Sequence, residues 1–344
     1  METVLAAQGR QTCHPLADAS QVGSVRRAAA DLCMRLGFDE TDAGEVAIAV
    51  SEAATNVLKH AGEGEILLRP LRSGTAVGVE ILALDRGPGI ASLAASMADG
   101  TSTAGSYGVG MGAMQRLACE FDIWSAPGKG TVLMMTLWQR GTERAPRALH
   151  CGVVCLPMRG EDVPGDSWAL ASDATSATVL VADGLGHGPL AAEAAELACS
   201  VAMDGAQQQA GTILEDTHAA LRATRGAAVA AVRIDMLREE LLFAGIGNIS
   251  AHLIGANERR QLVSHNGIVG SNMRKVQEFP APWDAHSLLV LHSDGLTSRW
   301  NLADYPGLTS RHPAVIAGVL YRDFTRGRDD VTVLALRDRQ GWTA

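Results

Sequence analysis

The sequence has 344 residues, which is long enough for two folded cores because a domain commonly takes about 100–200 residues. Its formal net charge of −9 disfavours binding to nucleic acid or to an anionic membrane surface, since their phosphates would be repelled. No stretch approaches the roughly 20 uncharged apolar residues of a membrane helix, and the first ten residues lack the basic start of an export signal, so we expect a cytoplasmic protein.

The first part of the chain predicts two amphipathic helices followed by strands. The first helix covers 19–36 with Asp18 as its expected cap, and the second runs from 39 or 41 to 60. Helices packed on an antiparallel or mixed sheet form an α+β sandwich. The apolar face of the second helix consists of Val46, Val50, Ala53 and Val57, and the predicted strands are 66–69, 77–84, 121–125 and 131–138.

The segment 141–149, within the stretch QRGTERAPRALH, is polar and basic and lacks an apolar period, so it predicts a linker. It separates a domain over 1–140 from a second over 150–344. Many strands and two long helical patterns, at 190–203 and 212–223, predict a β-sandwich flanked by helices and hence a second α+β domain. Its predicted strands are 148–156, 167–172, 178–182, 227–234, 240–243, 250–254, 287–292 and 331–336.

Glu52 and Asn56 lie four residues apart on the second helix, in SEAATNVLKHAG, and therefore share one face. An asparagine carbonyl is a hard oxygen ligand that suits Mg²⁺, and a carboxylate one turn earlier can orient or deprotonate a hydroxyl in phosphoryl transfer. Such a pair by itself is more often a solvated helix face.

Two glycine-containing motifs follow. In LALDRGPGI a strand ends at Asp85, which can accept a hydrogen bond from an exocyclic amine such as that of adenine. Gly87 and Gly89 let a flat ring approach the backbone. An ordinary turn explains this motif equally well.

In GSYGVGMGAMQRLACEF, glycines run straight into a helix, where successive backbone amides cradle phosphates. A lone glycine pattern is weak, and no βαβ unit surrounds it. These glycines are Gly108, Gly110 and Gly112.

In this order, and ending in PGKGT at 127–131, the three motifs resemble the ATP-binding domain of the GHKL superfamily over 18–138. The stretch DGTSTAGSYGVGMGAMQRLACEFDI is most similar to the small switch-protein serine kinases of bacterial stress and sporulation pathways, including a short lid at 98–105. A histidine kinase would need a helical hairpin ahead of this domain, and too few residues precede it. The resemblance implies ATP and Mg²⁺ as ligands, with Glu52 as catalytic base, Asn56 as Mg²⁺ ligand, Asp85 as adenine partner and Thr131 as a supporting contact.

The second half carries aspartates at predicted strand ends. Crowded carboxylates repel unless cations neutralise them, and all-oxygen ligation favours Mg²⁺ or Mn²⁺. Two such ions can activate a water for attack at phosphorus, which predicts a phosphoester hydrolase. Any single DG pair is more simply a turn, but four sites in strand context are harder to explain that way. They are Asp166 in VPGDSW, Asp183 in VLVADGLGHG, Asp294 in LVLHSDGL, and Asp329 with Asp330 in RDDVTVL.

As a set, VADGLGHG, SDGL and DDVTVL resemble the bacterial branch of the metal-dependent protein phosphatases over 150–336, and GIGNIS and NGIVG fit the same branch. Asp330 matches a position that is not usually a ligand, and His187 is expected to have a loop role. PGD stands where the family more often has GGD, and the family's phosphate-binding basic residue is not evident. The resemblance implies two Mn²⁺ or Mg²⁺ ions, with Asp183 bridging both, Gly184 lending its carbonyl, Asp166 serving one ion, and Asp294 and Asp329 the other.

The resulting hypothesis is a fused kinase and phosphatase of a partner-switching pathway that acts on serine or threonine of a small STAS-type regulator. Joining both activities raises their effective concentration on one shared substrate. A second hypothesis is a nucleotide- and partner-binding, anti-sigma-like module, engaging a sigma factor or other switch partner, attached to a working phosphatase. A third is a phosphatase for a small-molecule phosphoester.

Overall fold

The computed structural model describes residues 3–6, 10–91, 109–145, 148–255 and 258–342. The chain divides into two compact units. Residues 9–144 and 301–322 make the N-terminal unit, and residues 1–8, 145–300 and 323–343 make the C-terminal unit. The segment 301–322 therefore packs with the N-terminal unit although it follows the predicted linker in sequence, and the domain limits 1–140 and 150–344 stay a prediction.

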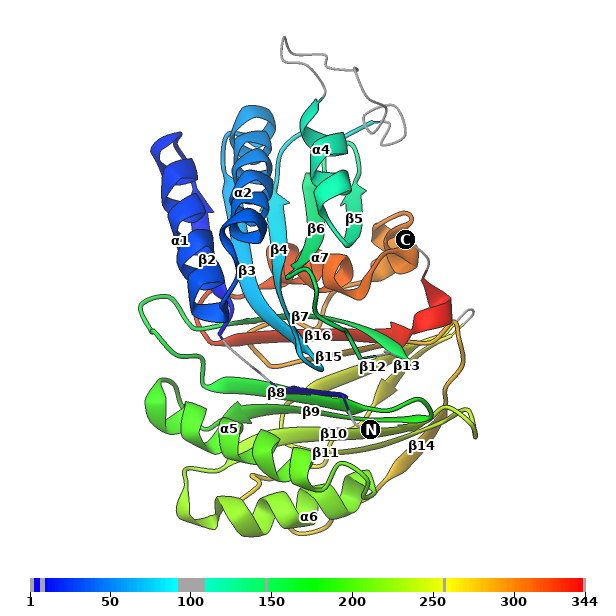
Figure 1. The fold of residues 1–344 in the computed structure, drawn as a ribbon. Coiled ribbons are helices and arrows are strands. Elements are labelled where there is room, and N and C mark those ends of the chain that lie inside the picture. Colours follow the sequence, from blue (N-terminus) through cyan, green and yellow to red (C-terminus); the bar gives the residue numbers. More distant parts are fainter. Residues whose placement is uncertain (1–2, 7–9, 92–108, 146–147, 256–257, 343–344) are drawn as a thin grey trace. The chain divides into compact units, whose positions relative to one another are not determined.

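The N-terminal unit is a five-stranded antiparallel sheet in the order β2-β3-β4-β6-β5, with α1, α2 and α4 on one face (Figure 1). This arrangement confirms the predicted α+β sandwich. The strands are β2 Thr12–Leu16, β3 Gly64–Ser73, β4 Ala76–Asp85, β5 Glu120–Ser125 and β6 Thr131–Trp138, and the helices are α1 Ser20–Leu36, α2 Glu40–Ala61 and α4 Val109–Leu117.

Helix α2 is held by a cap and by its apolar face. The Asp39 carboxylate accepts a hydrogen bond from the backbone N–H of Asp42 at 2.8 Å, which satisfies one of the free amides at the helix start. The Asp18 carboxylate does the same for the N–H of Ser20 at the start of α1. The predicted apolar face is confirmed, because its members are all buried in the core of this unit: Val46, Val50, Ala53 and Val57.

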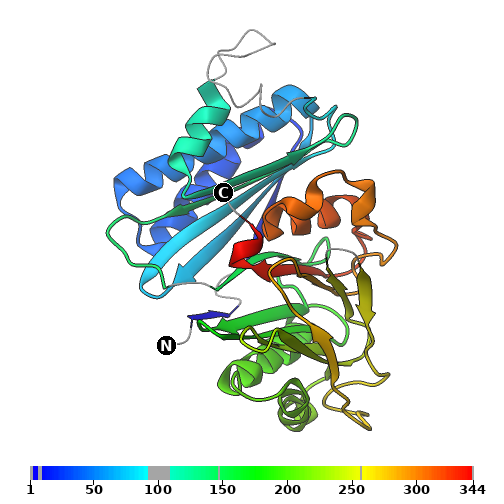
Figure 2. The ribbon, with the colours of Figure 1, turned by 90° about the vertical axis from the view of Figure 1, so that its right-hand side faces the viewer.

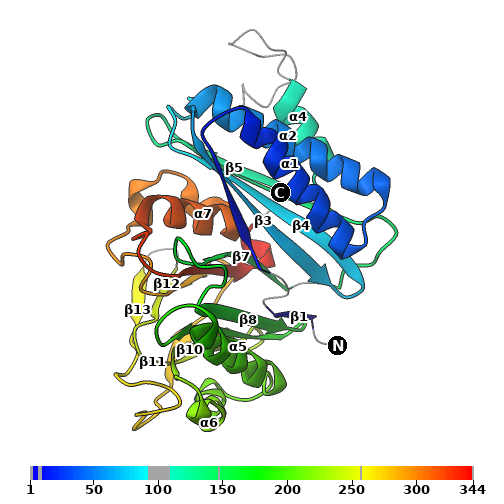
Figure 3. The ribbon, with the colours of Figure 1, turned by 90° about the vertical axis from the view of Figure 1, so that its left-hand side faces the viewer.

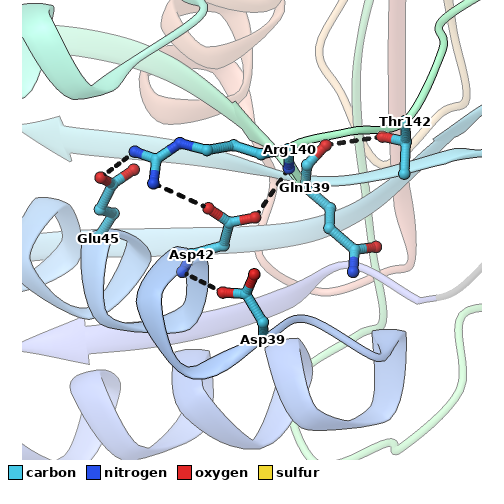
Figure 4. A network of polar contacts seen from close by, with 6 residues as sticks. All are labelled: Asp39, Asp42, Glu45, Gln139, Arg140 and Thr142. Atoms are coloured by element: carbon cyan, nitrogen blue, oxygen red, sulfur yellow. Dashed lines mark hydrogen bonds and ion pairs between the residues drawn. The ribbon is translucent and has the colours of Figure 1, made fainter.

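A polar network ties the end of β6 to the start of α2 (Figure 4). The buried carboxylate of Asp42 accepts the backbone N–H of Arg140 at 2.8 Å, and the Arg140 guanidinium pairs with Asp42 and Glu45. The Arg140 side chain is 61% exposed, so its ion pairs contribute little. The backbone hydrogen bond to a buried carboxylate is what holds the chain where it leaves the sheet.

The segment 301–322 lies on the other face of this sheet, where Figure 2 shows its helices in orange. It carries most of α7, Pro313–Phe324, and a Cβ on Gly318 would come within 2.9 Å of Val132 on β6. The Trp124 indole N–H donates to the carbonyl of Pro306 at 3.0 Å, and the Asp122 carboxylate accepts the N–H of His312. This unit therefore has apolar layers on both sides of its sheet.

The C-terminal unit is a sandwich of two antiparallel sheets, β1-β8-β9-β10-β11-β14 and β13-β12-β15-β16-β7. Helices α5, Pro189–Asp204, and α6, Ala210–Ala220, cover the outer face of the first sheet (Figure 3). The predicted sandwich flanked by helices is confirmed. The strands are β1 Thr3–Ala6, β7 Leu149–Leu156, β8 Asp166–Ser172, β9 Ser176–Gly184, β10 Ala227–Asp235, β11 Glu240–Ile246, β12 Ser250–Ile254, β13 Arg259–Leu262, β14 Phe279–Pro282, β15 Leu288–His292 and β16 Val331–Asp338. Within the described ranges, no helix combines the length and apolar character needed to span a bilayer.

A buried histidine in β12 should make stability depend on pH. His252 is 4% exposed, and its ring stacks on His292 at 6.0 Å between centroids. Burial, followed by the positive charges of Arg259 and His292, lowers the pKa of His252 to about 4. The unfolded imidazole therefore takes up a proton at a higher pH than the folded one does, and stability is lost as the pH falls from about 6.5 toward 4.

We expect this loss to be about 3 kcal/mol, and to disappear in His252→Gln. Denaturant unfolding at half-unit pH steps gives the free energy of unfolding at each pH. The loss is the difference between wild type and variant in how steeply this free energy falls with pH. His286→Gln is the matched control, because His286 lies exposed before β15. If the free energy of unfolding of wild type and of His252→Gln depended on pH in the same way, His252 would not be the group responsible.

Candidate functional site

In the N-terminal unit, Glu52 and Asn56 of α2 both approach the first turn of α4. A Cβ built on Gly110 would lie 2.7 Å from Glu52 Oε2 and 3.8 Å from Asn56 Nδ2. Only glycine leaves room for these side chains at the helix start, where free backbone amides favour anions. The structure thus brings together two sequence motifs that lie more than fifty residues apart.

Asp85 lies at the end of β4, opposite Thr131 at the start of β6. Its Oδ1 accepts the backbone N–H of Gly87 at 2.8 Å and that of Thr131 at 3.1 Å. Burial raises the pKa of Asp85, and these two hydrogen bonds lower it. The carboxylate is therefore fixed in place through one oxygen, and no hydrogen bond from a described residue engages Oδ2.

The glycines beside Asp85 have steric reasons to be there. Gly89 has φ +72°, and a Cβ on it would come within 2.0 Å of the Ala126 carbonyl. A Cβ on Gly87 would lie 2.7 Å from that of Ala61 at the end of α2. Gly112 lies within α4, whereas Gly108 and the predicted lid 98–105 fall outside the described residues.

In the C-terminal unit, Asp166 begins β8 and pairs directly with Asp183 on β9. Val181, two residues before Asp183, faces the core between the sheets, whereas Ala182 packs toward α5. Because side chains alternate along a strand, the Asp183 carboxylate points toward the second sheet. Asp294 follows β15 and Asp329 precedes β16, its neighbour in that second sheet.

The charges of these carboxylates affect one another. Burial, followed by the negative charges of Asp166, Asp294, Asp329 and Asp330, raises the pKa of Asp183 to about 8. Burial also raises the pKa of Asp166 to about 7, against the lowering effect of a hydroxyl hydrogen bond. A set of carboxylates that resist ionisation together is stabilised by bound cations.

Within the described residues, no three carboxylate, imidazole or thiol groups close around a single point tightly enough to enclose an ion alone. Mg²⁺ commonly keeps several waters and takes only one or two protein carboxylates, so an open arrangement of this kind fits it. The all-oxygen donor set suits Mg²⁺ or Mn²⁺.

Supporting residues that the sequence reasoning did not identify hold two of these carboxylates. The Ser293 hydroxyl donates to Asp166 Oδ2 at 2.6 Å, and the Asn248 side-chain amide donates to Asp294 Oδ2 at 2.7 Å. Both lie inside the motifs SDGL and GIGNIS, so their position in those motifs was the available signal.

Asp330 differs from its neighbour Asp329. It is 3% exposed, and its carboxylate accepts the backbone N–H groups of Met158 at 2.7 Å and Gly165 at 2.8 Å. Asp330 thereby anchors the loop before Asp166, which contains Pro164, and its oxygens are already engaged. Asp329 therefore stays the predicted ligand of this pair.

The turn after Asp183 is closely packed. A Cβ on Gly184 would lie 2.0 Å from the Ala191 carbonyl, so no side chain fits there. His187 Nδ1 lies 2.7 Å from Glu161 Oε1, which gives His187 a role in holding the loop. Burial, followed by the negative charge of Asp294, raises the pKa of Asp329.

Ser293→Ala should weaken metal binding. The hydroxyl holds Asp166 and also accepts the backbone N–H of Thr332 at 2.9 Å, so its loss frees the carboxylate and leaves a buried amide unpaired. We expect the Mn²⁺ concentration for half-maximal phosphatase activity to rise about 10- to 100-fold. Ser287→Ala is the matched control, because Ser287 is also buried but lies at the opposite end of β15 and bonds to Asp284. If Ser293→Ala and Ser287→Ala needed the same Mn²⁺ concentration for half-maximal activity, Ser293 would not support the metal ligand Asp166.

Comparison with known proteins agrees with both halves of this structure. The histidine kinase-like ATPase domain family matches residues 16–137, and the stage II sporulation protein E (SpoIIE) family matches residues 173–339. The serine/threonine-protein kinase RsbT of Bacillus subtilis (strain 168) is 32% identical over 130 residues, covering 38% of this chain and 98% of the kinase.

The phosphoserine phosphatase RsbX of the same organism is 25% identical over 182 residues, covering 52% of this chain and 89% of the phosphatase. A crystal structure of RsbX in complex with magnesium has a TM-score of 0.52 at 22% identity, covers 57% of this chain and 98% of that chain, and shares the fold. The predicted fusion is thereby confirmed. The chain belongs to the family of histidine kinase-like ATPase domains that includes RsbT, and it joins that domain to a SpoIIE-type protein phosphatase domain.

Proposed function

We propose that the N-terminal unit transfers the γ-phosphate of ATP to serine or threonine on a STAS-type regulator, and that the C-terminal unit hydrolyses the same kind of phosphoester. The observation that carries the hydrolase half is the mutual charge effect of Asp183 with Asp166, Asp294 and Asp329 at strand ends of both sheets. The opposed activities fit a partner-switching regulator, since one chain then sets the phosphorylation state of one substrate.

In the hydrolase half, Asp183 would bridge two Mn²⁺ or Mg²⁺ ions, Gly184 would lend its carbonyl, and Asp166, Asp294 and Asp329 would complete the ligands. Such a pair of ions supplies charge for the phosphoryl oxygens and makes water more acidic. The protein's own contribution is orientation, because Ser293 and Asn248 hold carboxylate oxygens by hydrogen bonds of 2.6 and 2.7 Å.

In the kinase half, Glu52 would accept the proton of the attacking hydroxyl and Asn56 would bind Mg²⁺. Asp85, held through Oδ1, would accept the exocyclic amine of adenine with Oδ2. The amides at the start of α4, beside Glu52, would face the phosphates. A carboxylate in contact with this helix start favours catalysis over nucleotide binding alone, because binding an anion there needs no base.

The test incubates the wild-type protein with labelled ATP, Mg²⁺ and a STAS protein, and separately with the phosphoserine form of that protein and Mn²⁺. We expect label on the STAS protein in the first case and release of phosphate in the second. Absence of transfer would leave the anti-sigma-like binding module as the function of the N-terminal unit. Faster hydrolysis of p-nitrophenyl phosphate than of the phosphoprotein, compared by kcat/KM, would favour a small-molecule substrate.

A further inference from the structure

Backbone contacts fix Arg225 beside the loop that follows Asp183. Ala227 of β10 pairs with Gly184, and the N–H of Leu185 donates to the carbonyl of Gly226 at 3.0 Å, which extends the pairing by one residue. Gly226 has φ +81°, and a Cβ on it would lie 2.6 Å from the Val269 carbonyl, so the turn depends on glycine. Arg225 is therefore held next to this loop by its backbone.

The Arg225 side chain lies over the same loop. Its Nη1 atom is 3.0 Å from the position that a Cβ on Gly186 would take, and Gly186 itself has φ +92°. Arg225 is exposed, and no hydrogen bond or ion pair from a described residue engages its guanidinium. Ala228 pairs with Asp183, so the backbone of Arg225 lies three residues along the chain from that pair, at most about 10 Å away.

A guanidinium at this loop would add directional N–H donors to the charge that the two proposed ions supply to the phosphoryl oxygens. His187 is already paired with Glu161 at 2.7 Å. Arg326 is exposed, and its backbone N–H donates to the carbonyl of Gly295 at 2.8 Å, which places its backbone beside the loop that follows β15. Arg328 is exposed, and no hydrogen bond or ion pair with a described residue holds it at the Gly186 loop. Of these four groups, Arg225 is the one that the described backbone pairing holds beside the Gly186 loop.

Resting on the proposed phosphatase function, we infer that Arg225 binds the phosphoryl group of the phosphoserine or phosphothreonine substrate. A guanidinium presents two parallel N–H donors that match two phosphoryl oxygens, and it stays charged at every working pH. A phosphate monoester offers these oxygens with a double negative charge, so the contact selects monoesters over diesters. Arg225 supplies the phosphate-binding basic residue that the sequence motifs did not reveal, at a position outside those motifs.

The test compares wild type, Arg225→Ala and Arg225→Lys in the full chain with Mn²⁺, using p-nitrophenyl phosphate and inorganic phosphate as probes. For Arg225→Ala we expect KM and the inhibition constant of phosphate to rise together by about 10- to 100-fold, with kcat changed less. Arg225→Lys should recover part of the loss, since it keeps the charge but not the paired donors. The Mn²⁺ activation curve should not move. Arg222→Ala, exposed three residues earlier in the same connection, is the matched control.

Calorimetric titration of inorganic phosphate into the Mn²⁺-loaded proteins gives a readout that needs no turnover. Weaker phosphate binding in Arg225→Ala than in Arg222→Ala supports the assignment even if the wild type proves inactive on phosphoproteins, which would contradict the proposed function alone. Phosphate affinity and KM within twofold of wild type would overturn the assignment. A shifted Mn²⁺ curve, or the same effect from Arg328→Ala with none from Arg225→Ala, would also overturn it.

Discussion

Asp183→Asn is expected to reduce phosphatase activity by about 10³-fold or more while leaving the protein folded. The substitution keeps the shape of the side chain but removes the charge of the proposed bridging ligand, and metal-ion activation is worth several kcal/mol of transition-state stabilisation. Added Mn²⁺ should not restore activity. Steady-state hydrolysis of p-nitrophenyl phosphate over a wide range of Mn²⁺ concentrations measures the effect.

The same substitution should leave unchanged or increase the thermal stability of the metal-free protein, although it abolishes activity. Burial and four neighbouring carboxylates raise the pKa of Asp183 to about 8, so the metal-free fold loses stability as the pH rises from the ordinary range of an aspartate toward 8, and the full cost is present at pH 9. Asp183→Asn should therefore unfold at the same or a higher temperature than wild type at pH 9 with chelator present. Asp216→Asn, exposed on α6, is the control and should change neither property. A destabilised Asp183→Asn with partial Mn²⁺ rescue would contradict the ligand role.

Regular patterns in the sequence predicted the elements that carry both candidate sites. The apolar period of α2 placed Val46 and Val57 in the core and so fixed which face carries Glu52 and Asn56. Strand β9 is buried on both faces and its sequence shows no such alternation, so the orientation of Asp183 toward the second sheet follows only from the structure, where Val181 and Ala182 lie in different core clusters.

Elements without such a pattern were missed. Helix α7 is buried on nearly every side, so its sequence PAVIAGVLYRDF has no polar face to reveal a helical period. Strands β13 and β14 have four residues each, too few to show alternation. Their existence depends on pairing with β12 and β11, which lies outside local sequence.

The residues that hold the carboxylates of the site were also missed, because no local sequence pattern reveals them. Ser293 and Asn248 act by contacts to Asp166 and Asp294, which lie 127 and 46 residues away. A serine beside an aspartate is common in loops, and only the sheet register brings its hydroxyl to a distant carboxylate. The carboxylates themselves were predictable because their charge demands a cation wherever they meet.

Glu52→Gln is expected to lower phosphate transfer from ATP to a STAS protein by about 10²- to 10⁴-fold, the usual contribution of a general base. Glutamine keeps the size of the side chain that touches the start of α4 at Gly110, so nucleotide affinity should stay within a few fold of wild type. Asn56→Ala should instead weaken Mg²⁺-dependent nucleotide binding, because it removes an oxygen ligand. Single-turnover transfer of labelled phosphate and fluorescent-nucleotide titration separate these two effects.

The control for Glu52→Gln is Glu40→Gln, which removes an exposed carboxylate from the first turn of the same helix. It changes net charge by the same amount and should leave transfer at the wild-type rate. Undiminished transfer by Glu52→Gln would show that the carboxylate beside Gly110 does not act as a base. Loss of nucleotide binding by Glu52→Gln would show instead that this side chain supports the nucleotide, because a base for the acceptor hydroxyl is not needed until phosphoryl transfer begins.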